Sequence, residues 1–212
     1  VILNIDNDHL DYFKNIENIN KAFIKYVQLL PDDGLLVVNL DNDYCSKLHN
    51  YTNAKTVSYG IQNDKANFVG RNITFDRNGF PRFDVYHNNF FYGSFELSVP
   101  GSHNVLNALA CISLCDAYGI PKQDIKSALK KYTGAHRRFE FVGSFDGISI
   151  YDDYGHHPTE IKATALALKK KTYHHSWVVF QPHTYSRTKN LLEDFADSLT
   201  YFDNIIITDI YA

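Results

Sequence analysis

The densest group of chemically active side chains lies between Asp152 and His157, where two carboxylates, a phenol and two imidazoles fall within six residues. The group follows a predicted strand, and ligands of α/β folds bind at the carboxyl ends of strands. Such side chains could bind a metal ion, a ribose or a carboxylate. Pro158 and Glu160 suit the first turn of a helix, so helix capping explains part of the group.

A second polar loop follows the next predicted strand and contains His183 and Arg187. This pair suits an anionic ligand, because arginine offers a planar fork of donors and histidine a donor that can be switched by protonation. The alternative is an ordinary solvated loop. If the two strands are neighbours in one sheet, the two polar loops lie side by side.

Two further groups are weaker candidates. Asn104 and Asn107 are three residues apart on a predicted helix and share a face, with His103 at the start of that helix. They could contact a ligand, or they could cap the helix. Arg138, in the pair that precedes Phe139, could bind a phosphate or could be surface charge at a domain junction.

His9 is a candidate metal ligand, because it lies among Asp6, Asp8 and Asp11 just after a predicted strand. Oxygen and imidazole ligands in this arrangement could hold a hard divalent cation, although a solvated loop has the same composition.

The elements that must position these residues begin with a predicted strand at Val1 to Asn4 and an amphipathic helix. The apolar face of this helix runs from Ile16 to Leu30, and Pro31 ends it. A continuous apolar run, Leu35 to Leu40, is typical of a buried strand in a mostly parallel sheet. Strand, helix and strand together indicate a crossover unit.

The next part of the chain predicts a small antiparallel meander followed by two helices. The alternating segments are Asn72 to Phe75, Phe83 to His87 and Phe90 to Leu97, with helices predicted over His103 to Tyr118 and Gln123 to Lys131.

After Gly134, strands and helices alternate again. Strands are predicted at Phe139 to Val142, Ile148 to Tyr151, Trp177 to Phe180 and Ile205 to Thr208, and helices at Thr159 to Lys170 and Lys189 to Leu199. This order predicts a doubly wound α/β domain and places a domain boundary near Gly134.

Composition excludes several classes of protein. The chain of 212 residues is 44% hydrophobic and 21% charged, as in average globular proteins, with a net charge of -3. A general nucleic-acid binder would carry a basic stripe instead. We expect no membrane segment and no secretory signal, because no apolar run approaches the span of a bilayer. Three cysteines without metal-site spacing suit a reducing cytoplasm, with Cys111 and Cys115 packed on an apolar helix face.

Six phrases, in order, resemble the Mur ligase family. They are DNDHLDYF (Asp6 to Phe13), LLPDDGLLVVN (Leu29 to Asn39), GSHNVLNALA (Gly101 to Ala110), HRRFE (His136 to Glu140), DDYGHHPTE (Asp152 to Glu160) and FQPHTYSRT (Phe180 to Thr188). The resemblance covers essentially the whole chain. It implies a central ATPase domain, in its C-terminal portion, over residues 1–133, and the N-terminal portion of a Rossmann-like ligase domain over residues 134–212.

The resemblance also implies an activity. Such a protein is a cytoplasmic ATP-dependent amide ligase of peptidoglycan precursor synthesis that uses Mg²⁺, and the phrases are most similar to the branch that joins L-alanine to UDP-N-acetylmuramate. The muramate carboxylate becomes an acyl phosphate, which the amine of L-alanine attacks. A branch that recycles murein tripeptide is the nearest alternative within the family.

Roles carry over residue by residue from the resemblance. His9 matches a histidine that helps to hold Mg²⁺ near the transferred phosphate. Asn104 and Asn107, with His103, match a helix start that meets the base of ATP. Arg138 and Asp153 match residues that close over the ribose and phosphates. The remaining candidates, which match positions around the muramoyl carboxylate and the incoming alanine, are Tyr154, His156, His183 and Arg187.

The family's glycine-rich phosphate loop is the main feature that this sequence lacks. No Gly-x-x-x-x-Gly-Lys-Thr phrase occurs, and the chain contains no Met, even at position 1. We therefore expect an internal fragment, without the UDP-binding domain and inactive by itself. One rival class stays open, a non-catalytic α/β module that binds a nucleotide. A second rival is a metal-dependent hydrolase using His9, His156 and His157, but their separation across two predicted domains and the lack of further histidine ligands argue against it.

Overall fold

The computed structural model describes all residues, 1–212, and the contacts of the chain divide it into two compact units. Unit 1 comprises Val1–Thr74, Pro81–Leu97 and Ser102–Lys131, and unit 2 comprises Phe75–Phe80, Ser98–Gly101 and Tyr132–Ala212. The predicted α/β class is confirmed. No helix in the chain combines the length and the apolar character needed to cross a bilayer.

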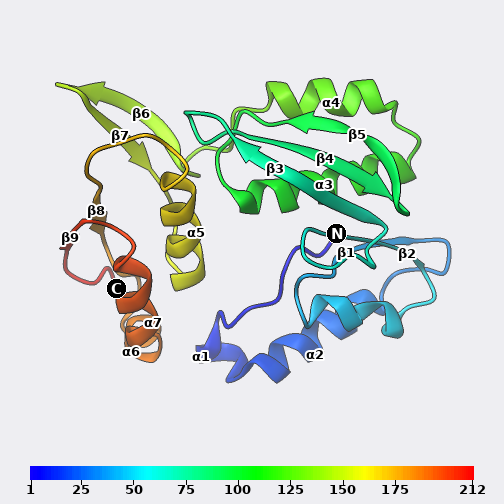
Figure 1. Cartoon of the computed structure of the whole chain (residues 1–212). Coiled ribbons are helices and arrows are strands. Elements are labelled where there is room, and N and C mark those ends of the chain that lie inside the picture. Colours follow the sequence, from blue (N-terminus) through cyan, green and yellow to red (C-terminus); the bar gives the residue numbers. More distant parts are fainter. The chain divides into compact units, whose positions relative to one another are not determined.

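Unit 1 is built on a mixed sheet of five strands in the order β1-β2-β3-β4-β5 (Figure 1). The strands are β1 (Leu35–Asn39), β2 (Lys55–Gly60), β3 (Phe68–Phe75), β4 (Pro81–His87) and β5 (Phe90–Glu96). β1, β2 and β3 pair in parallel, whereas β4 and β5 pair antiparallel. Burial follows this division. β1 is buried at four successive positions, while burial in β4 alternates along the strand, as expected when only one face is covered.

The helices of unit 1 cover this sheet with apolar side chains. They are α1 (Leu10–Phe13), α2 (Ile16–Val27), the 3₁₀ helix η1 (Cys45–Tyr51), α3 (Ser102–Ala117) and α4 (Lys122–Lys131). Ile19 and Val27 of α2 share a buried cluster with Leu36 and Val38 of β1. α3 is the central helix, and its Leu109 is fully buried. Its first two turns contain the predicted asparagines, Asn104 and Asn107.

The strand predicted at Val1 to Asn4 is wrong, because this segment forms only a single parallel bridge, between Ile2 and Val38. Side-chain amides replace the missing ladder. Asn39 donates to the Leu3 carbonyl at 3.0 Å and Asn42 donates to the Ile5 carbonyl at 3.2 Å. These bonds satisfy the backbone of an extended segment without continuing the sheet.

The C-terminal segment of unit 2, Tyr132–Ala212, begins with an antiparallel hairpin, where the sequence predicted strands of a doubly wound sheet. β6 (Glu140–Phe145) and β7 (Ile148–Asp152) pair with each other alone. Asp146 and Gly147, which join them, have φ values of 49° and 78°. A two-residue turn with positive φ at both positions matches the twist of antiparallel strands, so this turn fixes the hairpin.

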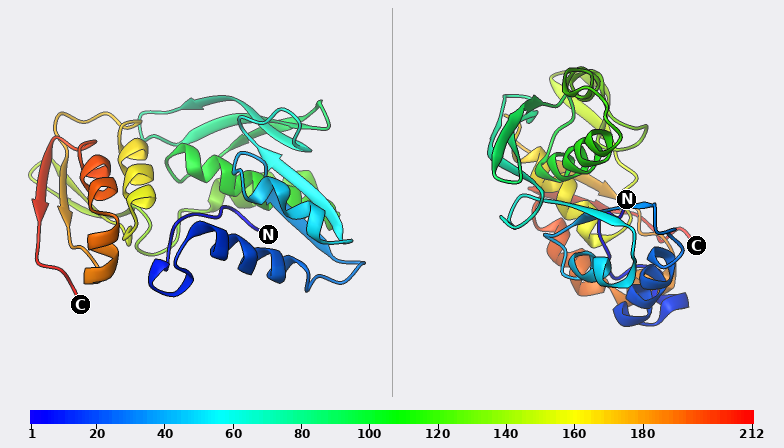
Figure 2. Two further views of the ribbon diagram at one scale, coloured as in Figure 1. Left: turned by 90° about the horizontal axis from the view of Figure 1, so that it is seen from below. Right: turned by 90° about the vertical axis from the view of Figure 1, so that its right-hand side faces the viewer.

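The rest of unit 2 is a parallel strand pair with helices packed on it. The elements are α5 (Pro158–Leu168), β8 (Trp177–Phe180), α6 (Tyr185–Asn190), α7 (Leu192–Leu199) and β9 (Asn204–Ile207). Figure 2 shows α5 and α7 on the same side of β8 and β9, and their buried cluster includes Ile161, Phe180 and Phe195. The helix predicted over Lys189 to Leu199 is divided in two, because Leu191 leaves helical geometry with φ -117° and ψ 25°.

Candidate functional site

The Asp153 carboxylate fastens two loops of unit 2 to a helix. We call residues 135–139 the Arg138 loop and residues 152–157 the Asp153 loop. Asp153 Oδ2 accepts from the Phe139 backbone N–H and from the Thr164 hydroxyl, both at 2.9 Å. Oδ1 accepts from the Gly155 N–H at 2.6 Å. An ionised carboxylate has about four acceptor positions, so roughly one remains for a ligand.

Gly155 permits this close packing. A Cβ atom at position 155 would lie 2.8 Å from Asp153 Oδ1, nearer than real Cβ contacts allow. A larger residue at position 155 would therefore have to displace the Asp153 carboxylate, which is held by the hydrogen bonds from Phe139 and Thr164.

The Arg138 loop is held in a backbone conformation that L-residues rarely adopt. Arg137 and Phe139 have φ values of 57° and 47°, and left-handed geometry costs about 1–2 kcal/mol per non-glycine residue. Two hydrogen bonds hold it. The Arg137 N–H donates to Glu140 Oε2 at 2.7 Å and the Phe139 N–H donates to Asp153. Strain that is held in place in this way is typical of functional loops.

The two arginines of this loop have different carboxylate partners. Arg137 Nε donates to Asp152 Oδ2 at 3.1 Å, and Arg138 Nη1 donates to Glu160 Oε1 at 3.2 Å. Their guanidinium carbons lie 4.9 Å and 5.9 Å from the centre of the Tyr154 ring. The Tyr154 N–H also donates to the Arg137 carbonyl at 2.8 Å. The loops thus bring together three of the predicted site residues, which are Arg138, Asp153 and Tyr154.

The two adjacent histidines have separate roles. His157 is buried and is the N-cap of α5, where its side chain and that of Glu160 form a capping box. His156 is partly exposed, and its Nδ1 lies 3.0 Å from the Tyr154 carbonyl. A carbonyl can only accept, so Nδ1 carries the hydrogen and Nε2 of the neutral ring is an acceptor. The capping bond to Nδ1 and the burial of His157 give this residue a structural role, which weakens the metal-hydrolase alternative.

His183 and Arg187 follow β8, as predicted, but the sheets do not make their loop a neighbour of the Asp153 loop. β7 pairs with β6, and β8 pairs with β9, so the expected adjacency of β7 and β8 within one sheet is wrong. The His183 ring instead lies 5.1 Å from the Tyr211 ring, and the Thr184 N–H donates to the Tyr211 carbonyl at 2.8 Å. Arg187 lies in the last turn of α6.

Unit 1 contains the remaining predicted residues. Asn104 and Asn107 share a face of α3 as predicted, since Asn107 Nδ2 donates to Asn104 Oδ1 at 3.2 Å. His103 precedes them in the first turn.

His9 lies at the start of α1, with Nε2 at 3.6 Å from Asp8 Oδ2. Mg²⁺ prefers an octahedral shell rich in oxygen. Across residues 1–212, no group of three or more His, Cys, Asp or Glu side chains is placed to hold a metal ion. His9 and Asp8 alone therefore do not make up a magnesium site.

Asp41 is a structurally important residue that the sequence reasoning missed. Its carboxylate, just after β1, accepts from the backbone N–H groups of Ile61, Gln62 and Asn63, which follow β2. It thereby ties together the carboxyl ends of two parallel strands, the edge where α/β folds place ligands. The available signal was an aspartate directly after an apolar run, with Gly60 closing the next strand.

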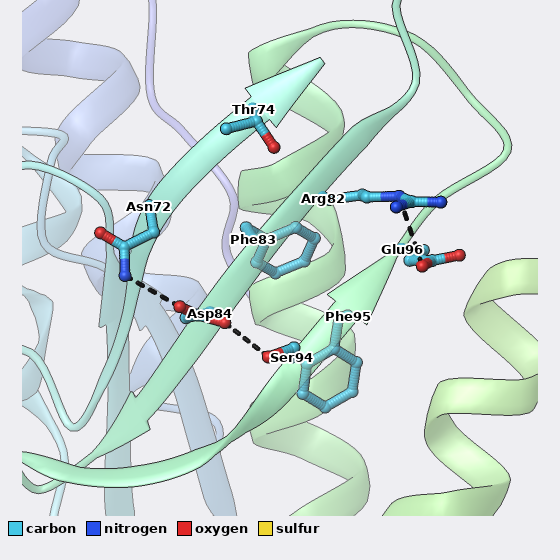
Figure 3. A pocket seen from close by; sticks show the side chains of 8 residues that line it. All are labelled: Asn72, Thr74, Arg82, Phe83, Asp84, Ser94, Phe95 and Glu96. Carbon is cyan, nitrogen blue, oxygen red and sulfur yellow. Dashed lines mark hydrogen bonds and ion pairs between the residues drawn. The ribbon is translucent and has the colours of Figure 1, made fainter. Parts of the chain in front are cut away.

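A shallow pocket of about 350 Å³ lies on the face of β3, β4 and β5 (Figure 3). Its polar side chains bind one another. Asp84 accepts from Asn72 at 2.8 Å and from Ser94 at 2.5 Å, while Arg82 pairs with Glu96 at 3.3 Å. The two hydrogen bonds lower the pKa of Asp84. The polar side chains of this pocket thus satisfy one another's hydrogen bonds, and none of the predicted site residues lines it.

Comparison with known proteins gives consistent matches over both units. The family model described as Mur ligase middle domain matches residues 1–115, and that described as Mur ligase, glutamate ligase domain matches residues 137–210. The UDP-N-acetylmuramate–L-alanine ligases of Caldanaerobacter subterraneus and Clostridium acetobutylicum are 46% and 45% identical to the chain over 212 residues. In both cases the match covers 100% of this chain and 46% of the relative.

Solved structures agree with these matches. The UDP-N-acetylmuramate-alanine ligase MurC from Thermotoga maritima superposes with a TM-score of 0.79 at 30% identity, over 99% of this chain and 45% of the other. MurF from Acinetobacter baumannii, at 21% identity, shares the fold with a TM-score of 0.83 over 97% of this chain and 45% of its own. The chain thus spans about half the length of the curated relatives that it matches.

Proposed function

The chain belongs to the Mur ligase family, and from this membership we propose that the whole protein joins L-alanine to UDP-N-acetylmuramate at the expense of ATP. The observation that carries the proposal is the 46% identity that extends over all 212 residues. Residues 1–133 would supply part of the middle, ATP-binding domain and residues 134–212 part of the C-terminal domain. We place the reaction in the cytoplasm, where its precursors are made.

The proposed chemistry proceeds in two transfers. The muramoyl carboxylate attacks the γ-phosphorus of ATP, which releases ADP and leaves an acyl phosphate. The amine of L-alanine, once deprotonated, then attacks the acyl carbon. The tetrahedral intermediate expels phosphate, so the products are the amide, ADP and phosphate. Negative charge develops on oxygen in both transfers, and fixed cationic donors stabilise it. Mg²⁺ would neutralise phosphate charge during the first transfer.

The residues of unit 2 suit this chemistry. Arg138 would bind phosphate, and its half-exposed guanidinium keeps donors beyond the one that Glu160 accepts. The remaining acceptor position of Asp153 would take a ribose hydroxyl. Tyr154 and His156 would lie near the reacting carboxylate and amine, with Nε2 of His156 as an acceptor. His183 and Arg187 would complete the anion contacts from the second loop.

The residues of unit 1 would serve the nucleotide and its metal. The paired amides of Asn104 and Asn107 on α3, with His103, would meet the base of ATP, and amides are suited to that contact because each offers both a donor and an acceptor. His9 would be one ligand of Mg²⁺. The other ligands would have to come from outside the group around His9.

The test is phosphate release by the whole protein with ATP, Mg²⁺ and UDP-N-acetylmuramate, with and without L-alanine. We expect release that requires both substrates and that falls sharply in Asp153→Ala and His156→Ala. Release that requires a murein tripeptide instead of L-alanine would assign the recycling branch of the family. Binding of nucleotide without any release would favour a non-catalytic module.

A further inference from the structure

The two carboxylate oxygens of Glu160 contact two different loops, and each loop has a different proposed ligand. Oε2 accepts from the backbone N–H groups of His156 and His157, at 3.0 Å and 3.3 Å. Oε1 accepts from Arg138 Nη1 at 3.2 Å. One side chain therefore connects the Asp153 loop, which contains His156, to the Arg138 loop.

Helix capping explains the contacts of only one of the two carboxylate oxygens of Glu160. A capping box needs a single acceptor on the residue at the third helical position, directed back to the N-cap N–H. In this chain Oε2 meets that need at His157, and it also holds the preceding N–H of His156. Oε1 is not required for the cap, and it points to a guanidinium that lies 22 residues away in the sequence.

Arg138 depends on this contact for its position. Among the ion pairs of the chain, its only carboxylate partner is Glu160, whereas Arg137 pairs with Asp152. The side chains of Arg138 and Glu160 are 52% and 34% exposed, so the pair faces solvent and a ligand could reach it. Fixing a long side chain before the ligand arrives reduces the entropy that binding must remove.

We propose that Glu160 is a positioning residue, which sets Arg138 for the nucleotide phosphates and holds the backbone of His156 in register with it. This inference rests on the function proposed above. It assigns to Glu160 a role in addition to capping the N-terminus of α5. It predicts that the Glu160 charge affects nucleotide binding only through Arg138.

The experiment compares Glu160→Gln with the wild-type whole protein. Glutamine keeps an oxygen that can accept from the capping N–H groups, but it loses the charge that holds Arg138. Glu193→Gln is the matched control, because Glu193 is an exposed glutamate in the first turn of α7. We expect the KM for ATP to rise about tenfold in Glu160→Gln, with only a small decrease in melting temperature relative to the control and a smaller effect on kcat.

A double-mutant cycle with Arg138→Gln supplies a result that a purely structural role would not give. If Glu160 acts through Arg138, adding Glu160→Gln to Arg138→Gln leaves the KM for ATP unchanged. Equal effects of Glu160→Gln in both backgrounds would overturn the proposal, and so would an unchanged KM in the single variant. If Glu160→Gln does not fold, Glu160→Asp replaces it, since aspartate keeps the charge but is one methylene too short to reach both partners.

Failure of the proposed function can be told apart from failure of this inference. ATP binding by the wild-type protein is measured first, by calorimetry. If the wild type neither binds ATP nor releases phosphate, the proposed function is wrong. If the wild type does both and the cycle is additive, only the positioning role of Glu160 is wrong.

Discussion

The Thr164 hydroxyl donates to Asp153 Oδ2 at 2.9 Å, which connects the second turn of α5 to the loop in front of it. The same oxygen accepts from the Phe139 N–H. One side chain therefore holds three segments together, and the proposed ribose contact of Asp153 is built on a structural junction. Effects of Asp153 variants on activity will include a contribution from this junction.

Thr164→Val tests the junction without touching the carboxylate. Valine has nearly the same shape but no hydroxyl, so the variant should lose about 1 kcal/mol of the free energy of unfolding. Denaturant unfolding measures it. Thr164→Ser, which keeps the hydroxyl, should lose less than Thr164→Val. A larger loss in Thr164→Ser than in Thr164→Val would show that the methyl group, rather than the hydrogen bond, contributes the stability.

Acid titration should reveal the ionised form of Glu160. Burial raises the pKa of this carboxyl, but the His156 N–H, the charge of the His156 ring when it is protonated, and the hydrogen bond and charge of Arg138 outweigh burial, and the pKa lies below its ordinary value of 4.5. The folded state thus binds the proton less readily than the unfolded state. The stabilisation is complete above the unfolded pKa and is lost as pH falls through the lower, folded value.

The measurement is the free energy of unfolding of the wild type and of Glu160→Gln at a series of pH values. We expect the difference between them to be constant near neutral pH and to shrink below about pH 4.5. The glutamine variant cannot titrate at this position, so other carboxyls cancel in the difference. A difference that does not change with pH would show that Glu160 has the same pKa in both states.

The thiols should react in an order set by their exposure. Cys111 is exposed and Cys115 partly exposed, so the buried packing predicted for this pair is wrong for Cys111. Cys45 is fully buried, and burial raises its pKa to about 12. Burial and the neighbouring Cys115 raise the pKa of Cys111 to about 11. Because the thiolate is the reactive form, Cys45 and Cys111 should react slowly at neutral pH.

An aromatic disulfide reagent at mildly alkaline pH provides the test. In the native protein it should modify Cys111 and Cys115, and it should reach Cys45 only after denaturation. Cys111→Ser should remove one reactive thiol from the native count. Rapid reaction of Cys45 in the native state would mean that the cluster of α2, β1 and η1 opens readily.

The sequence predicted best where burial and periodicity agree. The apolar run at β1 and the amphipathic face of α2 both formed as expected, because each must bury one face to fold. It failed where single residues, rather than a periodic pattern, determined the backbone conformation. Asn39 and Asn42 replaced a strand ladder at the start of the chain, and Leu191 interrupted a helix whose pattern looked continuous.

The same limit applies to the site. Neighbours along the chain were identifiable, such as the Asp153 loop and the asparagine pair on α3, since their spacing places them on one turn or one face. Partners that are distant in sequence were not. Nothing in the local pattern indicates that Glu160 meets Arg138, or that Asp41 caps the loop after β2. Such contacts depend on the tertiary fold.

The hairpin of β6 and β7 should depend on Gly147 for its conformation. Gly147 has φ 78° with open space around it, so an added Cβ would meet no neighbour and any effect must come from the backbone. Gly147→Ala should therefore lower the free energy of unfolding by about 1–2 kcal/mol. Gly143→Ala, in β6, is the matched control, because Gly143 also has open space but no positive φ. Equal stability of the two variants, measured by denaturant unfolding, would contradict a turn that requires left-handed geometry at position 147.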